Sequence, residues 1–304
     1  MMNIVILGSG AIGSFFGGML SKKNNVTLVG RKEHIQKIKN QGLQINGKTR
    51  LKRKINAVEH VYELNQSPDL LIITVKSFDT LKAITQAKGI IGKKTIILSF
   101  QNGLNNISQI KKVIAQNKII AGITTHGVQF VKPGMIHHKG IGSTVIGELS
   151  EEKTKRIHHL SSLFNDAGIK VSISDHIEED IWKKAIVNAN INPLTAIFNC
   201  ENGYLAKNPI LTTMIQKITK ESIEIAKKKG FSFNTEEMIE QTMQVIGQTK
   251  QNNSSMLQSN RQGKPTEINE INGAIAKIGR VYGCDVELND LLTKMIKTMH
   301  PTYL

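Results

Sequence analysis

The stretch NIVILGSGAIG, Asn3 to Gly13, decides the fold of this chain. A continuous apolar run is followed at once by glycines in the pattern G-x-G-x-x-G. This order predicts a buried strand, a tight turn and a helix whose N-terminus attracts an anion, because backbone N–H groups and the helix dipole favour negative charge there. The alternative is a glycine turn that only packs a helix on a strand. We expect the pyrophosphate of a dinucleotide to be held by Gly8, Ser9, Gly10, Ala11, Ile12 and Gly13.

Short β-branched runs and helical patterns alternate through the first half of the chain. Continuous apolar runs of this kind suit a sheet that is covered on both faces. A hairpin is expected around Asn46-Gly47, and further antiparallel strands around Pro133-Gly134. The alternation predicts an α/β fold with a Rossmann-like doubly wound sheet. Strands are expected over 3–8, 26–30, 70–75, 95–100 and 119–124, with helices over 11–21 and 34–40.

The sequence pattern changes at Asp175, after which the periodicity of the hydrophobic residues is almost entirely helical. Asp175 followed by Glu178 resembles a capping arrangement that opens a long helix. We therefore expect a dinucleotide-binding domain over 1–174 and an all-helical domain over 175–304.

Composition limits the classes of function. The net charge is +16, but its densest run, Lys48 to Lys54, has no interleaved aromatic residues, so nucleic-acid binding is not favoured. No apolar run reaches the ~18 residues of a membrane span. Cys200 and Cys284 form no ligand-like pattern, so no metal site is expected. With no secretion signal in the sequence, the expectation is a cytoplasmic protein with reduced thiols.

The residues after the second expected strand bear on the choice of cofactor. An NAD site usually carries Asp or Glu there, which accepts from the ribose hydroxyls. This chain has Gly30, then Arg31 and Lys32. A guanidinium suits a 2′-phosphate, so NADP(H) is favoured. Two alternatives remain: Arg31 points into water, or Glu33 reaches the ribose.

An apolar helical pattern around WKKAIVNANIN, Trp182 to Asn192, carries Lys184, Asn188 and Asn192 at intervals of four. Residues four apart drift by about 40° on an α-helix, so the three side chains form one polar stripe. Polar groups among core positions must be satisfied or face a cavity, and an oxygen-rich ligand would satisfy them. The alternatives are a lysine that extends to solvent, internal capping by Asn188, and Asn192 as the N-cap of a second helix beginning at Pro193.

Further candidates stand at the ends of expected strands and in the helical half. Lys76 and Asn102 each follow a strand at its carboxyl end, where open α/β sheets bind ligands. Ser255 and Glu267 lie in SSMLQ and TEINEINGAI. Taken alone, Glu267 would be interpreted as a solvated helix charge.

Together these stretches resemble the ketopantoate reductase family over nearly the whole chain. The motifs are GSGAIG, TVKSFDT, SFQNG, WKKAIVNANINPLTAIFNC, SSMLQ and TEINEINGAI. The resemblance implies a Rossmann domain joined to a helical domain, with the active site in a cleft between them. It implies NADPH-dependent reduction of 2-dehydropantoate to (R)-pantoate, a step toward pantothenate and coenzyme A.

The resemblance also assigns roles to single residues. It implies that Lys184 is the catalytic lysine and Glu267 its carboxylate partner, which is also near the cofactor. It implies substrate contacts for Asn188, Asn192, Ser255 and Asn102. The implied cofactor contacts include Arg31, Lys76 and Asn102. A Lys184 ammonium would stabilise the developing alkoxide and donate a proton to it.

One departure from the family is Ser259, which stands where the family usually has Asp after SSMLQ. It keeps open a related reductase of another branched 2-oxo acid. A non-catalytic NADP(H)-sensing protein is a further alternative, although it would not need Lys184 and Glu267. We expect a small 2-oxo acid as the partner, with no nucleic acid and no membrane, and leave both a monomer and a homodimer open.

Overall fold

The structure is a computed structural model that describes residues 1–299, and the chain divides into two compact units. The N-terminal unit contains residues 1–101 and 106–180. The helical unit begins at Ile181 and also includes the short segment Asn102–Asn105. The division falls within the first turn of helix α6 (Ile177–Ile197). Sequence reasoning placed the boundary before Asp175 and did not assign the short segment to the helical part.

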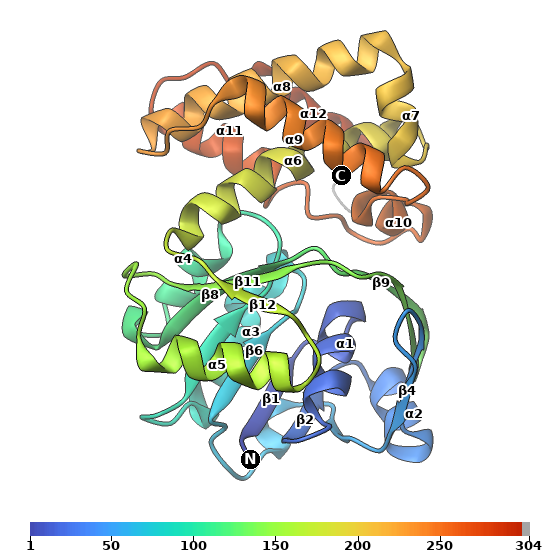
Figure 1. The fold of residues 1–304 in the computed structure, drawn as a ribbon, viewed down its shortest axis with the longest axis vertical. Helices are drawn as coiled ribbons and strands as arrows, with labels where there is room; N and C mark the ends of the chain where they lie inside the picture. The colour runs from blue at the N-terminus through green and yellow to red at the C-terminus, as the bar shows by residue number, and fades with distance from the viewer. Residues whose placement is uncertain (300–304) are drawn as a thin grey trace. The chain divides into compact units, whose positions relative to one another are not determined.

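An eight-stranded sheet forms the centre of the N-terminal unit (Figure 1). Its strand order is β12-β11-β8-β7-β6-β1-β2-β5. Strand β1 pairs in parallel with both β2 and β6, so the direction of winding reverses beside β1. The predicted Rossmann-like sheet is confirmed. The strands are β1 (Asn3–Leu7), β2 (Asn25–Val29), β5 (Asn56–Val58), β6 (Leu70–Ile73), β7 (Ile96–Ser99), β8 (Ile119–Thr124), β11 (Thr144–Glu148) and β12 (Val171–Ile173).

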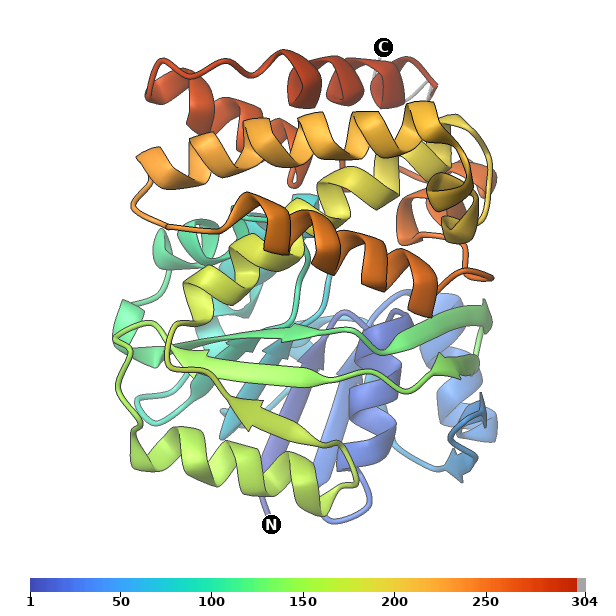
Figure 2. The ribbon, with the colours of Figure 1, turned by 45° about the horizontal axis from the view of Figure 1, so that its top comes forward.

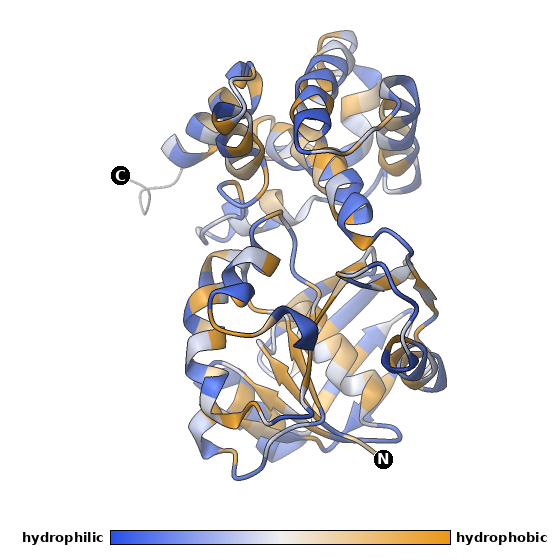
Figure 3. Ribbon diagram, turned by 90° about the vertical axis from the view of Figure 1, so that its left-hand side faces the viewer, coloured by the Kyte–Doolittle hydropathy of each residue, from blue (hydrophilic) through white to orange (hydrophobic). Residues whose placement is uncertain are grey.

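The apolar run of β1 contributes buried side chains to both faces of this sheet. Ile4 and Ile6 join one buried cluster, whereas Val5 and Leu7 join another. This alternation arises because successive side chains of a strand point to opposite faces. Figure 3 shows the resulting hydrophobic strands within the N-terminal unit. Helices supply side chains to the first cluster from α1 (Ala11–Leu20), α2 (Lys32–Gln41) and α5 (Lys155–Asp166), and to the second from α3 (Thr80–Ala87) and α4 (Asn106–Lys111).

A smaller sheet of four strands belongs to the same unit, in the order β4-β3-β10-β9. Its two antiparallel pairs agree with the hairpin and the Pro-Gly turn expected from the sequence. Gly47 and Gly134 adopt positive φ values of 94° and 79°, which favour glycine. The parallel pairing of β3 with β10 was not predicted. The strands are β3 (Leu43–Gly47), β4 (Leu51–Arg53), β9 (Gly127–Lys132) and β10 (Met135–Gly140).

The described part of the second unit consists of helices joined by loops, with no β-strand (Figure 2). Its first helix, α6, begins at Ile177, and the Asp175 carboxylate pairs with the Lys153 ammonium at 2.8 Å. Along residues 1–299 no helix combines the length and the apolarity that crossing a bilayer requires. The remaining helices are α7 (Asn202–Lys207), α8 (Pro209–Lys228), α9 (Thr235–Gln248), α10 (Ser255–Arg261), α11 (Asn272–Val281) and α12 (Glu287–Thr298).

A buried histidine ties the glycine-rich turn to the smaller sheet. The Gly134 N–H donates to His34 Nδ1 at 2.9 Å, so the neutral imidazole carries its proton on Nε2. That nitrogen lies 3.0 Å from Ser14 Oγ, whose hydroxyl donates to the Ser9 carbonyl at 3.0 Å. Burial lowers the pKa of His34 from 6.5 to about 4. Sequence reasoning missed this residue because one histidine in a helical pattern carries no local signal.

We predict that acid destabilises the chain partly through His34. The unfolded chain gains a proton at this side chain below about pH 6.5, and the folded chain only below about pH 4. The unfolding free energy should therefore fall as pH drops through this window, by up to about 3 kcal/mol from this group. His34→Gln should show a smaller loss in urea titrations at pH 6.5 and 4.5. His159→Gln, at an exposed position, is the control. Equal losses in all three proteins would contradict the prediction.

Candidate active site

The glycine-rich turn between β1 and α1 lets backbone segments approach closely. Gly8 has a φ of 106°, and a Cβ there would lie 2.5 Å from Val75 N. A Cβ on Gly13 would lie 2.1 Å from Gly8 O. A Cβ on Gly10, in contrast, would meet no atom within 4 Å. Gly8 and Gly13 are needed by the fold itself, whereas Gly10 leaves open space at the start of α1.

The N-terminus of α1 has the features of an anion site. Gly10 is its N-cap residue, and no side chain accepts from the first turn. The N–H groups of Gly8 and Ser9 are used, since both donate to Val29 O. The first-turn N–H groups of a helix without a side-chain cap need acceptors. Open space beside uncapped N–H groups fits the pyrophosphate of a dinucleotide.

The end of β2 has no room for an acidic side chain. A Cβ on Gly30 would lie 1.8 Å from Ser9 Oγ, so a side chain at position 30 would require the Ser9 hydroxyl to move. Arg31 follows as the N-cap residue of α2, and its side chain is exposed. The end of β2 therefore carries glycine where many NAD enzymes have a carboxylate that binds the ribose hydroxyls, and Arg31 follows it, with Glu33 in the first turn of α2.

Lys76 directly follows the part of the chain that touches the glycine turn. The Thr74 hydroxyl donates to Gly8 O at 2.8 Å, and Val75 N is the atom nearest to where a Cβ on Gly8 would lie. Lys76 is half-buried. This arrangement brings Lys76 to the carboxyl end of β6, beside β1, where the winding of the sheet reverses. Ligands of open α/β sheets bind at such a point.

Three polar side chains form a chain within the helical unit. Lys184 Nζ donates to Asn102 Oδ1 at 2.9 Å, and Asn102 Nδ2 donates to Glu267 Oε2 at 3.3 Å. An ammonium can only donate and a carboxylate can only accept, so the orientation of the Asn102 amide is fixed. The interpretation of Glu267 as a solvated helix charge is wrong: its side chain is 6% exposed and precedes α11 in a turn. The structure thus brings together three residues from distant parts of the sequence.

The segment that carries Asn102 approaches the turn of Glu267 closely. Leu104 N donates to Glu270 O at 3.0 Å. Gly103 has a φ of 91°, and a Cβ there would lie 2.4 Å from Glu270 O. Glycine at position 103 is therefore required for Asn102 to reach Glu267.

The electrostatics of Lys184 suit proton transfer near neutral pH. Burial lowers the pKa of Lys184 from 10.5 to about 8, and the Glu267 carboxylate opposes that shift. The lysine does not extend freely to solvent, since it is half-buried and its ammonium is bonded to Asn102. A lysine with this pKa can hold a proton at pH 7 and release it readily.

The two asparagines of the stripe lie on α6 as the spacing predicts. Asn188 is half-buried and Asn192 is 5% exposed. The helix continues through Pro193, so the alternative of Asn192 as an N-cap is wrong. The neighbouring Asn190, which sequence reasoning did not single out, donates to Ile186 O at 2.9 Å inside the core.

Ser254 and Ser255 at the start of α10 have different surroundings, a difference that the sequence did not predict. Ser255 begins α10 and has an exposed side chain. Ser254 is buried, caps α10 by accepting from Leu257 N, and accepts from the Thr195 hydroxyl at 2.7 Å. The structure therefore shows Ser254 as the residue that links α10 to α6, and leaves the Ser255 hydroxyl accessible.

Comparisons with known proteins identify the family of this chain. Residues 4–151 match the family model described as ketopantoate reductase PanE/ApbA, and residues 176–300 match its C-terminal counterpart. A 2-dehydropantoate 2-reductase from Pyrococcus abyssi is 37% identical over 97% of each chain. One from Archaeoglobus fulgidus is 31% identical over 98% of this chain and 97% of that protein.

Solved structures extend the likeness to three dimensions. A D-mandelate dehydrogenase with NADH and anilino(oxo)acetate superposes with a TM-score of 0.94 at 29% identity, covering 99% of both chains. A PanE/ApbA family ketopantoate reductase from Ralstonia eutropha gives 0.91 at 27% identity, with the same coverage. The matched family models, the curated relatives and the fold agree, and the chain belongs to the ketopantoate reductase family of oxidoreductases that use a nicotinamide dinucleotide.

Proposed function

We propose that this chain reduces 2-dehydropantoate to (R)-pantoate with NADPH, a reaction that leads toward pantothenate and coenzyme A. The observation that carries the proposal is the chain from Lys184 through Asn102 to Glu267, with a lysine pKa of about 8. The relatives at 37% identity bear the name of this activity. The chain is expected to act in the cytoplasm.

The proposed catalytic steps follow from the residues of this chain. The dinucleotide supplies a hydride when it is bound. Lys184, held by Asn102, stabilises the negative charge that develops on the ketone oxygen and donates a proton to it. Glu267 keeps the ammonium charged, because its carboxylate raises the pKa of Lys184 against the effect of burial. Asn188, Asn192 and Ser255 offer donors and acceptors for the hydroxyl and carboxylate of the substrate.

A second candidate is the reduction of another 2-oxo acid. A structure with a TM-score of 0.94 is a D-mandelate dehydrogenase bound to anilino(oxo)acetate, so this fold also accommodates an aryl-substituted oxo acid. Ser259 replaces the carboxylate that the family usually has at this position in α10. Oxidation of NADPH should be compared over a panel that contains 2-dehydropantoate, unbranched and branched 2-oxo acids, and phenylglyoxylate. The highest kcat/KM for phenylglyoxylate would favour the second candidate.

Gly10 should be required for cofactor binding but not for folding. In Gly10→Ala the new Cβ meets no protein atom, yet it fills the space proposed for the pyrophosphate. Its dinucleotide Kd should rise at least about tenfold, equivalent to about 1.4 kcal/mol, with an unchanged Tm. Gly13→Ala should lower the Tm as well, because its Cβ would collide with Gly8 O. Gly89→Ala, which also enters open space, is the control. A Gly10→Ala protein with native affinity would contradict this site.

The coenzyme preference should depend on Arg31. Arg31→Glu should reduce the preference for NADPH over NADH by about 1–3 kcal/mol, since it removes a charge-assisted contact to the 2′-phosphate. Lys39→Glu makes the same charge change at an exposed position near the other end of α2 and should have little effect. The ratio of kcat/KM values for the two coenzymes measures the preference. Equal efficiency with both coenzymes in the unmodified protein would reject the assignment to NADPH.

Lys184 and Glu267 should act as one unit. Lys184→Ala should lower kcat by about 10²–10⁴, the range for a positioned proton donor, while NADPH affinity changes little. Glu267→Ala should lower the rate less, because water can still orient the ammonium. The double variant should lose much less than the product of the two effects, because residues that act together are not additive. Near-native turnover in Lys184→Ala would overturn the mechanism.

The pH profile gives an independent reading of the same pair. The ammonium form of Lys184 is present below its pKa, so kcat/KM should fall as pH rises above about 8. Glu267 raises that pKa, so Glu267→Gln should move the alkaline limb to lower pH. Profiles from pH 6 to 10 should be compared between the two proteins. A limb that stays in place in Glu267→Gln would show that the titrating group is not Lys184.

A further inference from the structure

Pro193 lies inside α6 and leaves one carbonyl of that helix without its usual partner. A proline has no N–H, so the carbonyl four residues earlier, that of Ala189, loses its backbone hydrogen bond. A buried carbonyl without a donor costs free energy. The Asn272 side chain from α11 supplies the donor: its Nδ2 lies 3.0 Å from Ala189 O. Asn272 is 0% exposed, so water cannot take over this bond.

The orientation of Asn272 is set by a second buried amide. Asn272 Nδ2 also donates to Asn289 Oδ1 at 3.0 Å. Asn289 in turn donates from Nδ2 to the Glu221 carboxylate at 2.8 Å and to Ser222 Oγ at 3.1 Å. Because a carboxylate can only accept, Asn289 must point its oxygen toward Asn272. Both hydrogens of the Asn272 amide are thereby committed, one of them to Ala189.

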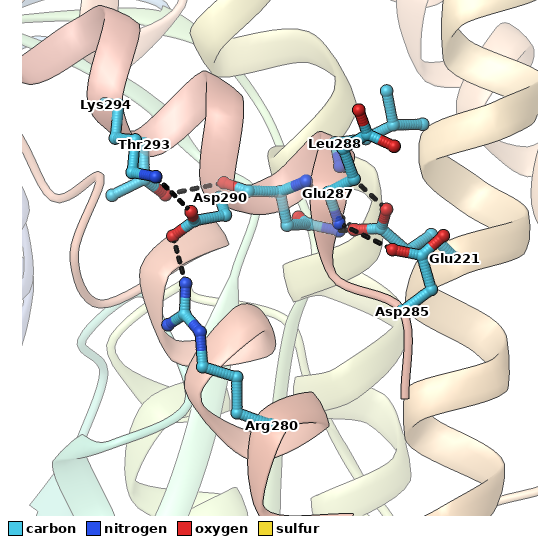
Figure 4. Close-up of polar contacts among 9 residues, drawn as sticks. Glu221, Arg280, Asp285, Glu287, Leu288, Asp290, Thr293 and Lys294 are labelled. Carbon is cyan, nitrogen blue, oxygen red and sulfur yellow. Dashed lines mark hydrogen bonds and ion pairs between the residues drawn. The ribbon is translucent and has the colours of Figure 1, made fainter. Parts of the chain in front are cut away.

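Glu221 on α8 anchors this network at the start of α12. Its carboxylate accepts from Leu288 N at 2.8 Å and from Asn289 N at 2.9 Å, and Figure 4 shows it facing the first turn of α12. A carboxylate at a helix N-terminus is stabilised by the free N–H groups and by the helix dipole. The network therefore joins α8, α12, α11 and α6 through polar groups in the core.

The Ala189 carbonyl lies in the segment of α6 that carries Asn188 and Asn192 of the polar stripe. Ala189 directly follows Asn188, and Asn192 directly precedes Pro193. The Thr195 hydroxyl lies 2.7 Å from Ile191 O and 3.1 Å from Asn192 O, so a side-chain hydroxyl also stands beside two other carbonyls of this helix segment. A displacement of about 1 Å in such a segment is enough to weaken reaction geometry strongly.

We propose that Asn272 is a positioning residue for the substrate stripe, because it replaces the hydrogen bond that Pro193 removes and fixes the segment of α6 that carries Asn188 and Asn192. Asn272 does not touch the substrate or the cofactor in this assignment. The inference rests on the proposed function, since Asn188 and Asn192 are proposed substrate contacts. It adds the physical reason why an interior proline and a distant buried amide occur together.

The test is a rescue experiment built on Pro193. Asn272→Ala should raise KM for 2-dehydropantoate about tenfold, a loss in the range of a small misplacement, with kcat changed less and NADPH Kd unchanged. Pro193→Ala restores an N–H four residues after Ala189 and lets α6 close its own bond. Adding Asn272→Ala in the Pro193→Ala background should therefore raise KM less than about twofold. A tenfold increase in both backgrounds would overturn the proposal.

Asn190 offers a matched control on the same helix. It is also 0% exposed, and its Nδ2 donates to Ile186 O and to Thr219 Oγ1. Asn190→Ala should lower the Tm as Asn272→Ala does, but Pro193→Ala should not rescue it. If Asn190→Ala and Asn272→Ala lower the Tm equally and neither changes KM, Asn272 has only a structural role.

A readout without turnover separates this proposal from the proposed function. Hydrogen–deuterium exchange of residues 185–192 should speed up in Asn272→Ala and return toward native rates in the Pro193→Ala background. If the unmodified protein reduces no 2-oxo acid, the proposed function fails, and this exchange experiment still decides whether Asn272 holds α6. Unchanged exchange in Asn272→Ala would overturn the positioning role even in an active reductase.

Discussion

A lysine ammonium that is withdrawn from water has to be hydrogen-bonded and offset by a negative charge, and the helical unit meets this requirement around Lys184. Asn102 accepts from the ammonium and passes the contact to Glu267. To do so, a short segment that follows β7 in the chain belongs to the helical unit, and Gly103 provides the close approach. The cost of burying the charge yields a lysine whose pKa lies near 8, where a proton donor is most useful.

The glycine-rich turn depends on close packing between backbone atoms. Gly8 and Gly13 are packed so tightly that a methyl group would collide with main-chain atoms, whereas Gly10 faces open space. The fold itself therefore demands Gly8 and Gly13, and the proposed pyrophosphate site accounts for Gly10. The Ser9 carbonyl accepts from Ser14 on α1, which also contacts His34 on α2, so side chains of these two helices support the turn.

The family relationship places this chemistry in a fold that several reductases share. A D-mandelate dehydrogenase and a ketopantoate reductase both superpose on nearly the entire chain. The fold alone therefore does not select the oxo acid, which depends on side chains around the reacting carbon. Ser259 and the exposed Ser255 both lie on α10.

The sequence by itself determined the local elements of this protein. The apolar run and glycines of 3–13 predicted β1, the turn and α1, because strand alternation, helix periodicity and glycine turns are encoded by near neighbours. The spacing of Lys184, Asn188 and Asn192 likewise placed all three on one helix.

Only the tertiary structure decided which distant groups meet. Asn102 and Glu267 are 165 positions apart, and neither has a local signal for the other. The same holds for the parallel pairing of β3 with β10 and for the hydrogen bond from Asn272 to the Ala189 carbonyl. Local patterns specify which face of an element is buried, but the partner of a buried polar group is fixed only when packing removes water from both.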